Sequence, residues 1–135
     1  MDKQAEFISI LETKYPKLYK KKVWPEFDEG WYKLVEELSN EIYQKYNEWS
    51  NLTDVPFVEQ MKEKFGGLRF YLGSDTFFMD YPEKYDEIDL IVRKYEKKSQ
   101  ETCEYCSAFG SVRRQRGMWL KCMCDDCERK YAVLR

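Results

Sequence analysis

Apolar residues recur at helical spacing in three segments of this chain, which predicts three helices. The strongest pattern follows Asp28, a suitable N-cap, and ends at the polar stretch "SNLTD". A weaker pattern opens the chain and is broken at Pro16, and a third follows Asp80, Pro82 and Glu83, whose order is typical of a helix start. The apolar positions of the three helices are, in chain order, Phe7, Ile8, Leu11, Tyr15 and Leu18; Trp31, Leu34, Val35, Leu38, Ile42, Tyr46 and Trp49; and Tyr85, Ile88, Ile91, Val92 and Tyr95.

Between the second and third helices the pattern changes to alternation, which predicts a β-hairpin. Gly66 and Gly67 fit a two-residue turn, in which both positions need a positive φ. The resulting 65:68 register leaves Glu63 on the apolar face opposite Phe70, a conflict that would mark a buried ion pair. The register puts Met61, Phe65, Leu68, Phe70 and Leu72 on one face, and Lys62, Lys64, Arg69 and Tyr71 on the other.

The sequence leaves one alternative open for this segment and predicts one further strand after it. A helix over 57–65 would also place Val58, Met61 and Phe65 on one face, so the sequence does not exclude it. The turn residues at 73–75 precede the stretch "TFFM", which we expect to form a short further strand.

Composition indicates a globular protein and disfavours a general nucleic-acid binder. The 135 residues are 43% hydrophobic and 36% charged, with a formal net charge of −2, whereas nucleic-acid binding favours a basic excess. Aromatic residues reach 17%, more than a small core needs, so we expect some aromatic surface to face a partner or to cover the C-terminal lobe. The sequence has no apolar stretch typical of a membrane span or signal peptide, so we expect a cytoplasmic protein with reduced thiols.

All five cysteines lie in the stretch "TCEYCSAFGSVRRQRGMWLKCMCDDC". Cys103 and Cys106, then Cys124 and Cys127, form two C-x-x-C pairs whose spacing predicts one structural Zn²⁺ ion held by four thiolates. Cys122 is the surplus thiol, because only the pairing of Cys124 with Cys127 repeats the gap of the first pair. We expect Cys122 to be a small buried residue of a hairpin strand.

The predicted fold is α+β. Helices pack on a small antiparallel sheet in residues 1–99, and residues 100–135 form a zinc-finger lobe, treble-clef-like or zinc-ribbon-like, packed on that domain. In the lobe, "SVRRQ" and "MWLKC" are the expected strands, with Gly117 near the turn, and "ERKYAVLR" the expected start of a short helix.

Three segments carry a resemblance. "GWYKLVEELSNEI", "EQMKEKFGGLRFYL" and the cysteine stretch, in this order, resemble a family of small uncharacterised phage and prophage proteins; the resemblance spans about residues 30–127, except a variable stretch at 73–87. It implies zinc ligands at Cys124 and Cys127 and leaves Cys122 outside, although many relatives have His at the position of Cys127. No chemistry is carried over with it.

These observations favour a non-enzymatic zinc-binding protein that binds another protein. The resemblance implies a phage-type accessory protein that binds a host protein, with inhibition of a host defence system as one form of this function. The alternatives are a nucleic-acid-binding zinc finger and a binder of phosphate-bearing ligands such as nucleotides. Their candidate residues are Arg113, Arg114, Arg116 and Trp119, helped by Lys121, and Lys62, Lys64, Arg69 and Tyr71 on the first hairpin.

Catalysis is disfavoured by the residues that are present. The chain has no histidine, the commonest general base, so a nucleophilic role for Cys122 would have no such partner. Asp86, Glu87 and Asp89 are spread around a helix by their spacing, which keeps them from converging on one cleft. The sequence therefore predicts a protein that is not an enzyme.

Overall fold

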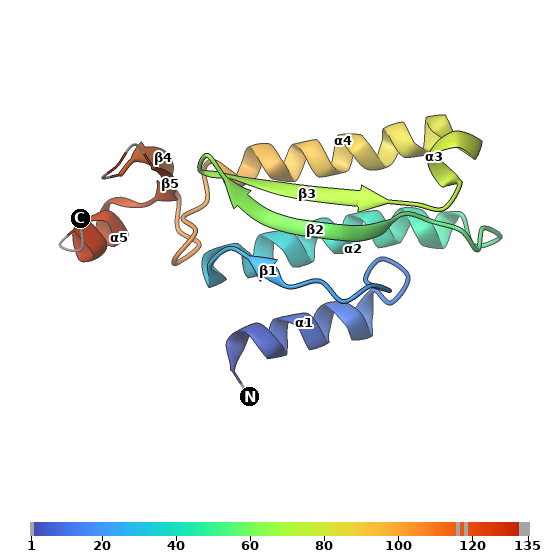
Figure 1. The fold of residues 1–135 in the computed structure, drawn as a ribbon, viewed down its shortest axis with the longest axis horizontal. Helices are drawn as coiled ribbons and strands as arrows, with labels where there is room; N and C mark the ends of the chain where they lie inside the picture. The colour runs from blue at the N-terminus through green and yellow to red at the C-terminus, as the bar shows by residue number, and fades with distance from the viewer. Residues whose placement is uncertain (1, 116, 118, 133–135) are drawn as a thin grey trace.

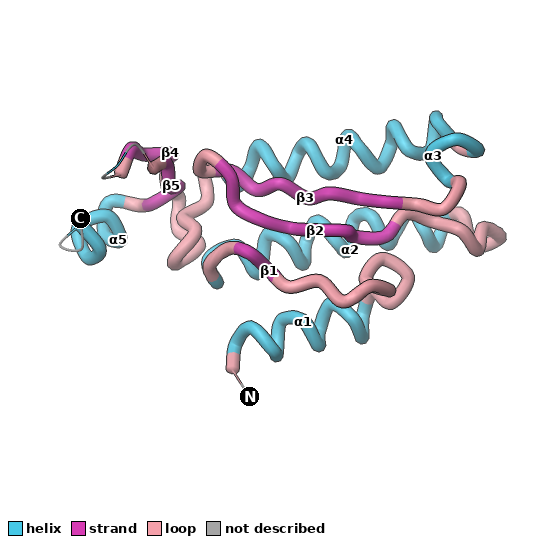
Figure 2. Tube along the Cα trace, in the orientation of Figure 1, coloured by secondary structure: helices cyan, strands magenta, loops and turns pink. Residues whose placement is uncertain are grey.

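The computed structural model describes residues 2–115, 117 and 119–132, and Figure 1 shows the course of the chain. Figure 2 shows the division into helices, strands and loops. In chain order the elements are α1 (Lys3–Lys14), β1 (Pro25–Glu26), the 3₁₀ turn η1 (Glu29–Trp31), α2 (Tyr32–Glu48), β2 (Phe57–Lys64), β3 (Gly67–Gly73), α3 (Phe77–Asp80), α4 (Pro82–Ser99), β4 (Ser111–Arg114), β5 (Leu120–Met123) and α5 (Asp125–Ala132). The prediction of an α+β fold is confirmed.

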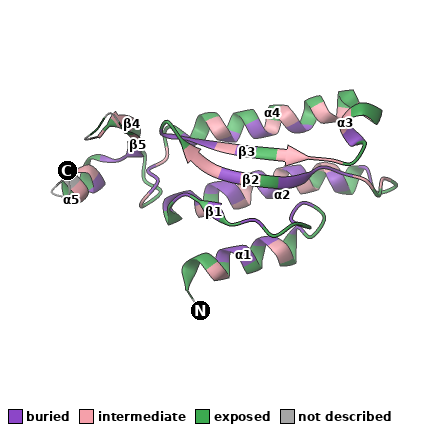
Figure 3. Ribbon diagram, viewed as in Figure 1, coloured by how far each residue is buried: buried purple, intermediate pink, exposed green. Residues whose placement is uncertain are grey.

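The main core lies between α2, α4 and the inner face of the β2–β3 hairpin. Helix α4 packs along β3 and against α2, and α1 contacts α2 (Figure 1). Leu38 and Ile42 of α2, Met61 of β2, Leu68 of β3 and Ile88 of α4 are completely buried, and Figure 3 shows the buried stripes that result. The apolar faces that the sequence predicts for these helices are thus buried together in one shared core.

The first sheet has the order β1-β2-β3, with β1 parallel to β2 and β2 antiparallel to β3. The predicted 65:68 register is wrong: Lys64 pairs with Gly67, so the turn residues are Phe65 and Gly66, both with positive φ (55° and 83°). Phe65 therefore points away from the core and is 65% exposed. The 57–65 segment is a strand, not a helix.

The register also changes the environment of Glu63. Glu63 pairs with Leu68 rather than Phe70, and its carboxylate accepts a hydrogen bond from the Gly66 backbone N–H at 2.7 Å. It closes the turn instead of forming the ion pair that we expected for a carboxylate on the apolar face.

One prediction about the segment before α4 is also wrong, whereas the predicted helix start near Pro82 is confirmed. The stretch "TFFM" does not form a strand, because Phe77–Asp80 is a short helix that buries Phe77 completely. Asp80 ends this helix instead of capping the next one, and α4 begins at Pro82, a residue suited to the first helical position. Asp28 precedes η1 but makes no side-chain cap.

The C-terminal lobe lies at the end of the sheet, beyond the β2–β3 turn (Figure 1). Strands β4 and β5 pair antiparallel, and Cys122 and Val112, opposite each other, pack against the main core. The helix of the lobe begins at Asp125, earlier than predicted, and contains Cys127. None of the described helices has the length and hydropathy needed to cross a bilayer.

Candidate metal centre

Four cysteine sulfurs converge in the C-terminal lobe. The Sγ atoms of Cys103, Cys106, Cys124 and Cys127 all lie within 4.8 Å of one another. A tetrahedral Zn²⁺ site with Zn–S bonds of about 2.3 Å separates its sulfurs by about 3.8 Å. The distance of 3.6 Å between the Cys106 and Cys124 sulfurs matches this edge and is far longer than a disulfide bond. The four residues could therefore hold one tetrahedral metal ion.

The first pair of sulfurs lies in a tight loop. The Cys103 backbone N–H donates to the Ala108 carbonyl at 2.7 Å, and the Ser107 N–H donates to the Cys103 carbonyl at 3.0 Å. Ser107 has a φ of 74°, a left-handed conformation that lets the chain reverse directly after Cys106. This reversal brings the Cys106 sulfur back toward the other three.

The second pair lies at the start of α5. The Cys127 backbone N–H donates to the Cys124 sulfur at 3.4 Å, and this hydrogen bond, the largest cause, lowers the pKa of Cys124 to about 7. A thiol with a lowered pKa is ready to bind a metal ion as thiolate near neutral pH. Helix α5 thus contains the ligand Cys127, and the backbone N–H of Cys127 lowers the pKa of the ligand Cys124.

Cys122 lies outside this cluster. It is completely buried in β5, where it joins the main core, and burial raises the pKa of its thiol to about 12. A buried, protonated thiol is a poor nucleophile. The structure places Cys122 in the environment that we expected for a small apolar residue.

The metal lobe is docked on the turn that precedes α2. The Gly30 N–H donates to the Glu104 carbonyl at 2.7 Å, and the Ser107 hydroxyl donates to the Gly30 carbonyl at 2.6 Å. The buried Trp31 indole Nε1 donates to the Thr102 carbonyl at 2.8 Å. The "GW" pair therefore forms the surface on which the first cysteine loop docks.

A buried ionic network reinforces this junction, and sequence reasoning missed it. Glu104 is 1% exposed; its carboxylate accepts from the Asp28 N–H at 2.9 Å and from the Lys121 ammonium at 3.0 Å. Burial raises the pKa of Glu104; burial alone would lower the pKa of Lys121, but the Glu104 carboxylate raises it. Both shifts follow from one ion pair removed from water. The only sequence signal was a charged residue inside a cysteine pair.

Two basic residues of the β4–β5 hairpin, Arg113 and Lys121, are paired within the chain. Arg113 pairs with Asp125 at 2.8 Å and with Glu128 at 3.0 Å, and Lys121 is held by Glu104. Trp119 is 65% exposed, Arg114 lies in β4 opposite Leu120, and Arg116 lies outside the described residues. Internal carboxylates thus neutralise Arg113 and Lys121, two of the charges that nucleic-acid binding by this hairpin would use.

The other predicted candidates lie together on the outer face of β2 and β3. Lys62 and Arg69 are opposite each other, Lys64 is at the turn, and the Lys62 Nζ is 6.0 Å from the centre of the Tyr71 ring. These four residues are exposed or half-buried. The structure thus brings them into one surface.

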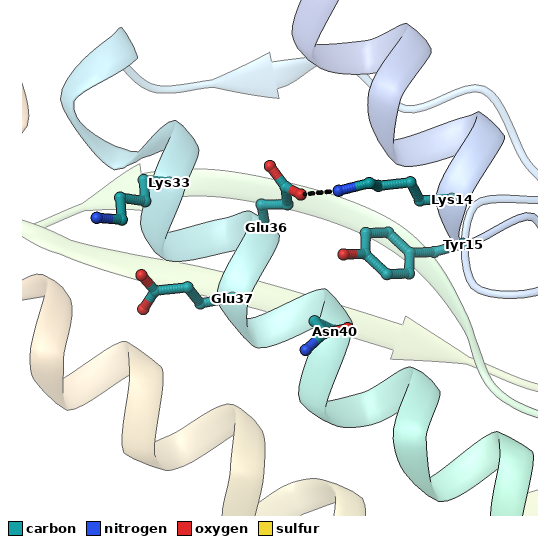
Figure 4. A pocket seen from close by; sticks show the side chains of 6 residues that line it. All are labelled: Lys14, Tyr15, Lys33, Glu36, Glu37 and Asn40. Atoms are coloured by element: carbon teal, nitrogen blue, oxygen red, sulfur yellow. Dashed lines mark hydrogen bonds and ion pairs between the residues drawn. The ribbon is translucent and has the colours of Figure 1, made fainter.

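A hollow of about 360 Å³ lies beside α1 and α2, far along the chain from the cysteines (Figure 4). The Lys14 ammonium donates to Glu36 at 2.8 Å, which raises the pKa of Lys14. This pair ties the end of α1 to α2, and we assign the hollow to the packing of these helices. Its lining residues are Lys14, Tyr15, Lys33, Glu36, Glu37 and Asn40.

The cysteine cluster, the docked loop and the buried ion pair form one structural unit. Comparison of the chain with family models, with curated proteins and with solved structures finds no match.

Proposed function

We propose that this chain is a non-enzymatic zinc-binding protein that acts by binding another protein. The observation that carries the proposal is the four-sulfur site. Four protein ligands complete the tetrahedral shell of Zn²⁺ and leave no position for a water molecule or a substrate, so such a site supplies folding free energy rather than catalysis.

The position of the site supports the same role. The first cysteine loop is fastened to Gly30 and Trp31, and β5 contributes Cys122 to the main core. A metal ion at the four sulfurs would therefore fix the orientation of the lobe relative to the sheet. We infer that the metal maintains a binding surface.

Exposed aromatic side chains support a protein partner. Trp24, Phe65, Phe109 and Trp119 are 53%, 65%, 79% and 65% exposed. Large aromatic residues are enriched at the centres of protein interfaces, where their burial contributes much of the binding free energy. Nucleic-acid binding by the β4–β5 hairpin has less support, because Arg113 and Lys121 are paired internally.

The resemblance to phage and prophage proteins supports a finer form of the proposal. In that form the chain is an accessory protein in the cytoplasm of a bacterial host; it binds a host protein and inhibits a host defence system. This form rests on the resemblance, whereas the binding role rests on the site and its surroundings.

The test is capture of partners from a bacterial lysate by the zinc-loaded protein. We expect one stoichiometric Zn²⁺ ion by elemental analysis, and specific recovery of a protein that the zinc-stripped chain recovers poorly. Recovery of nucleic acid alone, or of nothing, by the zinc-loaded chain would refute the binding role.

A further inference from the structure

The turn between β2 and β3 contains a residue that folding does not favour there. Phe65 has a φ of 55° and the following Gly66 a φ of 83°, so both turn positions are left-handed. Gly, Asn and Asp are preferred at the first such position, and a bulky side chain there is strained. Phe65 is also 65% exposed, so its ring gains little from burial in this chain. A large apolar residue in a strained, exposed position is typical of a functional site.

The cations next to this turn are not held in ion pairs by other residues of the described chain. Many other lysines and arginines form ion pairs, as in Lys94 with Glu41 at 2.8 Å, whereas some isolated lysines on other faces, such as Lys17, Lys33 and Lys97, form none with the residues described. Among the residues that the structure describes, none forms an ion pair with Lys62, Lys64 or Arg69. Glu96 lies within electrostatic range of Arg69 and Glu26 is the sheet partner of Lys62, but neither forms an ion pair with these cations, so the three positive charges remain available to a negative ligand.

The strand geometry sets the spacing of these charges. Lys62 and Lys64 lie on the same face of β2, two residues apart, which separates them by about 6.6 Å along the strand. Arg69 lies directly across from Lys62. An extended peptide with acidic side chains at alternate positions has the same repeat, so its carboxylates match the cations one by one.

The β3 edge of the sheet is closed to such a peptide. The outward N–H groups of Leu68 and Phe70 donate to the Ser99 hydroxyl at 2.8 Å and to the Glu96 carboxylate at 2.9 Å. Helix α4 therefore occupies the β3 edge, and a partner cannot add a strand there. At the β3 edge, recognition therefore has to use side chains on the outer face.

From these contacts we propose that Phe65, Lys62, Lys64, Arg69 and Tyr71 form a docking surface, the hairpin face, for an extended acidic segment of a protein partner. The exposed rings of Phe65 and Tyr71 supply apolar contact area, and the three cations fix the register of the acidic side chains. The inference rests on the proposed protein-binding function and names the chemistry of the partner.

A peptide fits this surface better than a nucleic acid does. Glu26 pairs with Lys62 in the sheet and its carboxylate accepts from the Gln60 amide at 3.0 Å, so negative charge borders the cations. A nucleic-acid backbone carries a phosphate at every nucleotide and would meet this carboxylate, whereas a peptide can present a neutral residue to it. Three cations are also fewer than the roughly 6–10 phosphate contacts of a typical nucleic-acid binder.

The test measures binding of a short fluorescein-labelled peptide in which Glu alternates with Thr, with labelled oligothymidylate and ATP as competing probes. We expect the triple variant Lys62→Gln, Lys64→Gln, Arg69→Gln to lose roughly tenfold or more in peptide affinity. The control triple variant Lys17→Gln, Lys33→Gln, Lys97→Gln removes the same charge from exposed sites elsewhere and should bind as the wild type does.

A second variant separates binding from folding. Phe65→Asn places a residue suited to a left-handed turn at this position, so we expect a higher Tm together with weaker peptide binding. Phe109→Asn, the control at an exposed ring outside the hairpin face, should leave the peptide affinity unchanged.

The proposal is overturned by any of four results: the wild type does not bind the peptide, the two triple variants bind it equally, Phe65→Asn keeps full affinity, or oligothymidylate or ATP binds more tightly at the same residues. Lysate capture distinguishes this failure from failure of the proposed function. If the wild type and the hairpin-face variant capture the same protein equally, the protein-binding function stands and only this surface is wrong.

Discussion

Gly30 and Glu104 touch through their backbones: the Gly30 N–H donates to the Glu104 carbonyl at 2.7 Å. A Cβ atom added at Gly30 would lie 2.3 Å from this oxygen and 2.3 Å from the Cys103 carbonyl oxygen. These backbone atoms are held by the loop that carries two metal ligands. Position 30 therefore has to be glycine because of space, not because of a special φ.

We expect Gly30→Ala to cost about 3 kcal/mol of stability, because the cysteine loop has to move away from η1. Thermal and denaturant unfolding measure this cost. The control is Gly67→Ala, where the added Cβ meets only the Gln100 side chain at 3.4 Å, so the cost should be much smaller. Equal costs at the two positions would contradict the docking of the loop on Gly30.

The second prediction concerns the metal. Cys124→Ser removes a ligand, so we expect loss of the stoichiometric Zn²⁺ ion and a lower Tm. Cys122→Ser should keep one ion per chain, although burying a hydroxyl in the core costs about 1–3 kcal/mol. Elemental analysis of both purified variants measures the metal. Retention of the ion by Cys124→Ser, or its loss from Cys122→Ser, would show that the ligand set is different.

The third prediction concerns the buried ion pair of Glu104 and Lys121. Lys121→Met leaves the Glu104 carboxylate buried without its cation, and breaking a buried pair in this way costs about 3–5 kcal/mol. Adding Glu104→Gln to Lys121→Met should recover part of this loss, because the uncompensated charge disappears. A double-mutant cycle by urea unfolding measures the coupling.

Asp28→Asn provides the control for that cycle. The Asp28 carboxylate also contacts Lys121, at 3.3 Å, but its side chain is 49% exposed. Solvent screens an exposed pair, so we expect a change of only about 0–1 kcal/mol. A larger effect from Asp28 than from Lys121 would place the strength of the network at the surface instead of in the interior.

The fourth prediction concerns thiol reactivity and its pH dependence. With a pKa of about 12, Cys122 stays protonated as the pH rises from about 7 to 9, so iodoacetamide should not modify it in the zinc-loaded protein. The exposed Cys106 should be modified as soon as a chelator removes the metal, before Cys122 reacts. Mass spectrometry of the digested protein follows each site. Early modification of Cys122 would mean that it is accessible in the folded chain.

The helices and the cysteine ligand pattern could be predicted because their signals are local. The spacing of Leu34, Val35, Leu38 and Ile42 places these residues on one side of a helix whatever the partner is. The two C-x-x-C pairs likewise have a spacing that is typical of a metal site. The hairpin was also foreseen, but not its turn, because the sequence "FGG" offers two registers that both keep Met61, Leu68 and Phe70 on the core face, so alternation alone does not select between them.

The sequence by itself determined the three long helices, where the chain alternates, and that four thiols are spaced for one metal ion, since each of these depends on residues near one another in the chain. Only the tertiary structure decided which charges are free. Glu104 meets Asp28 and Lys121 across 76 and 17 residues, and Arg113 meets Glu128 across 15, whereas Lys62, Lys64 and Arg69 face solvent. A charge is neutralised or available according to its neighbours in space, and packing sets those neighbours.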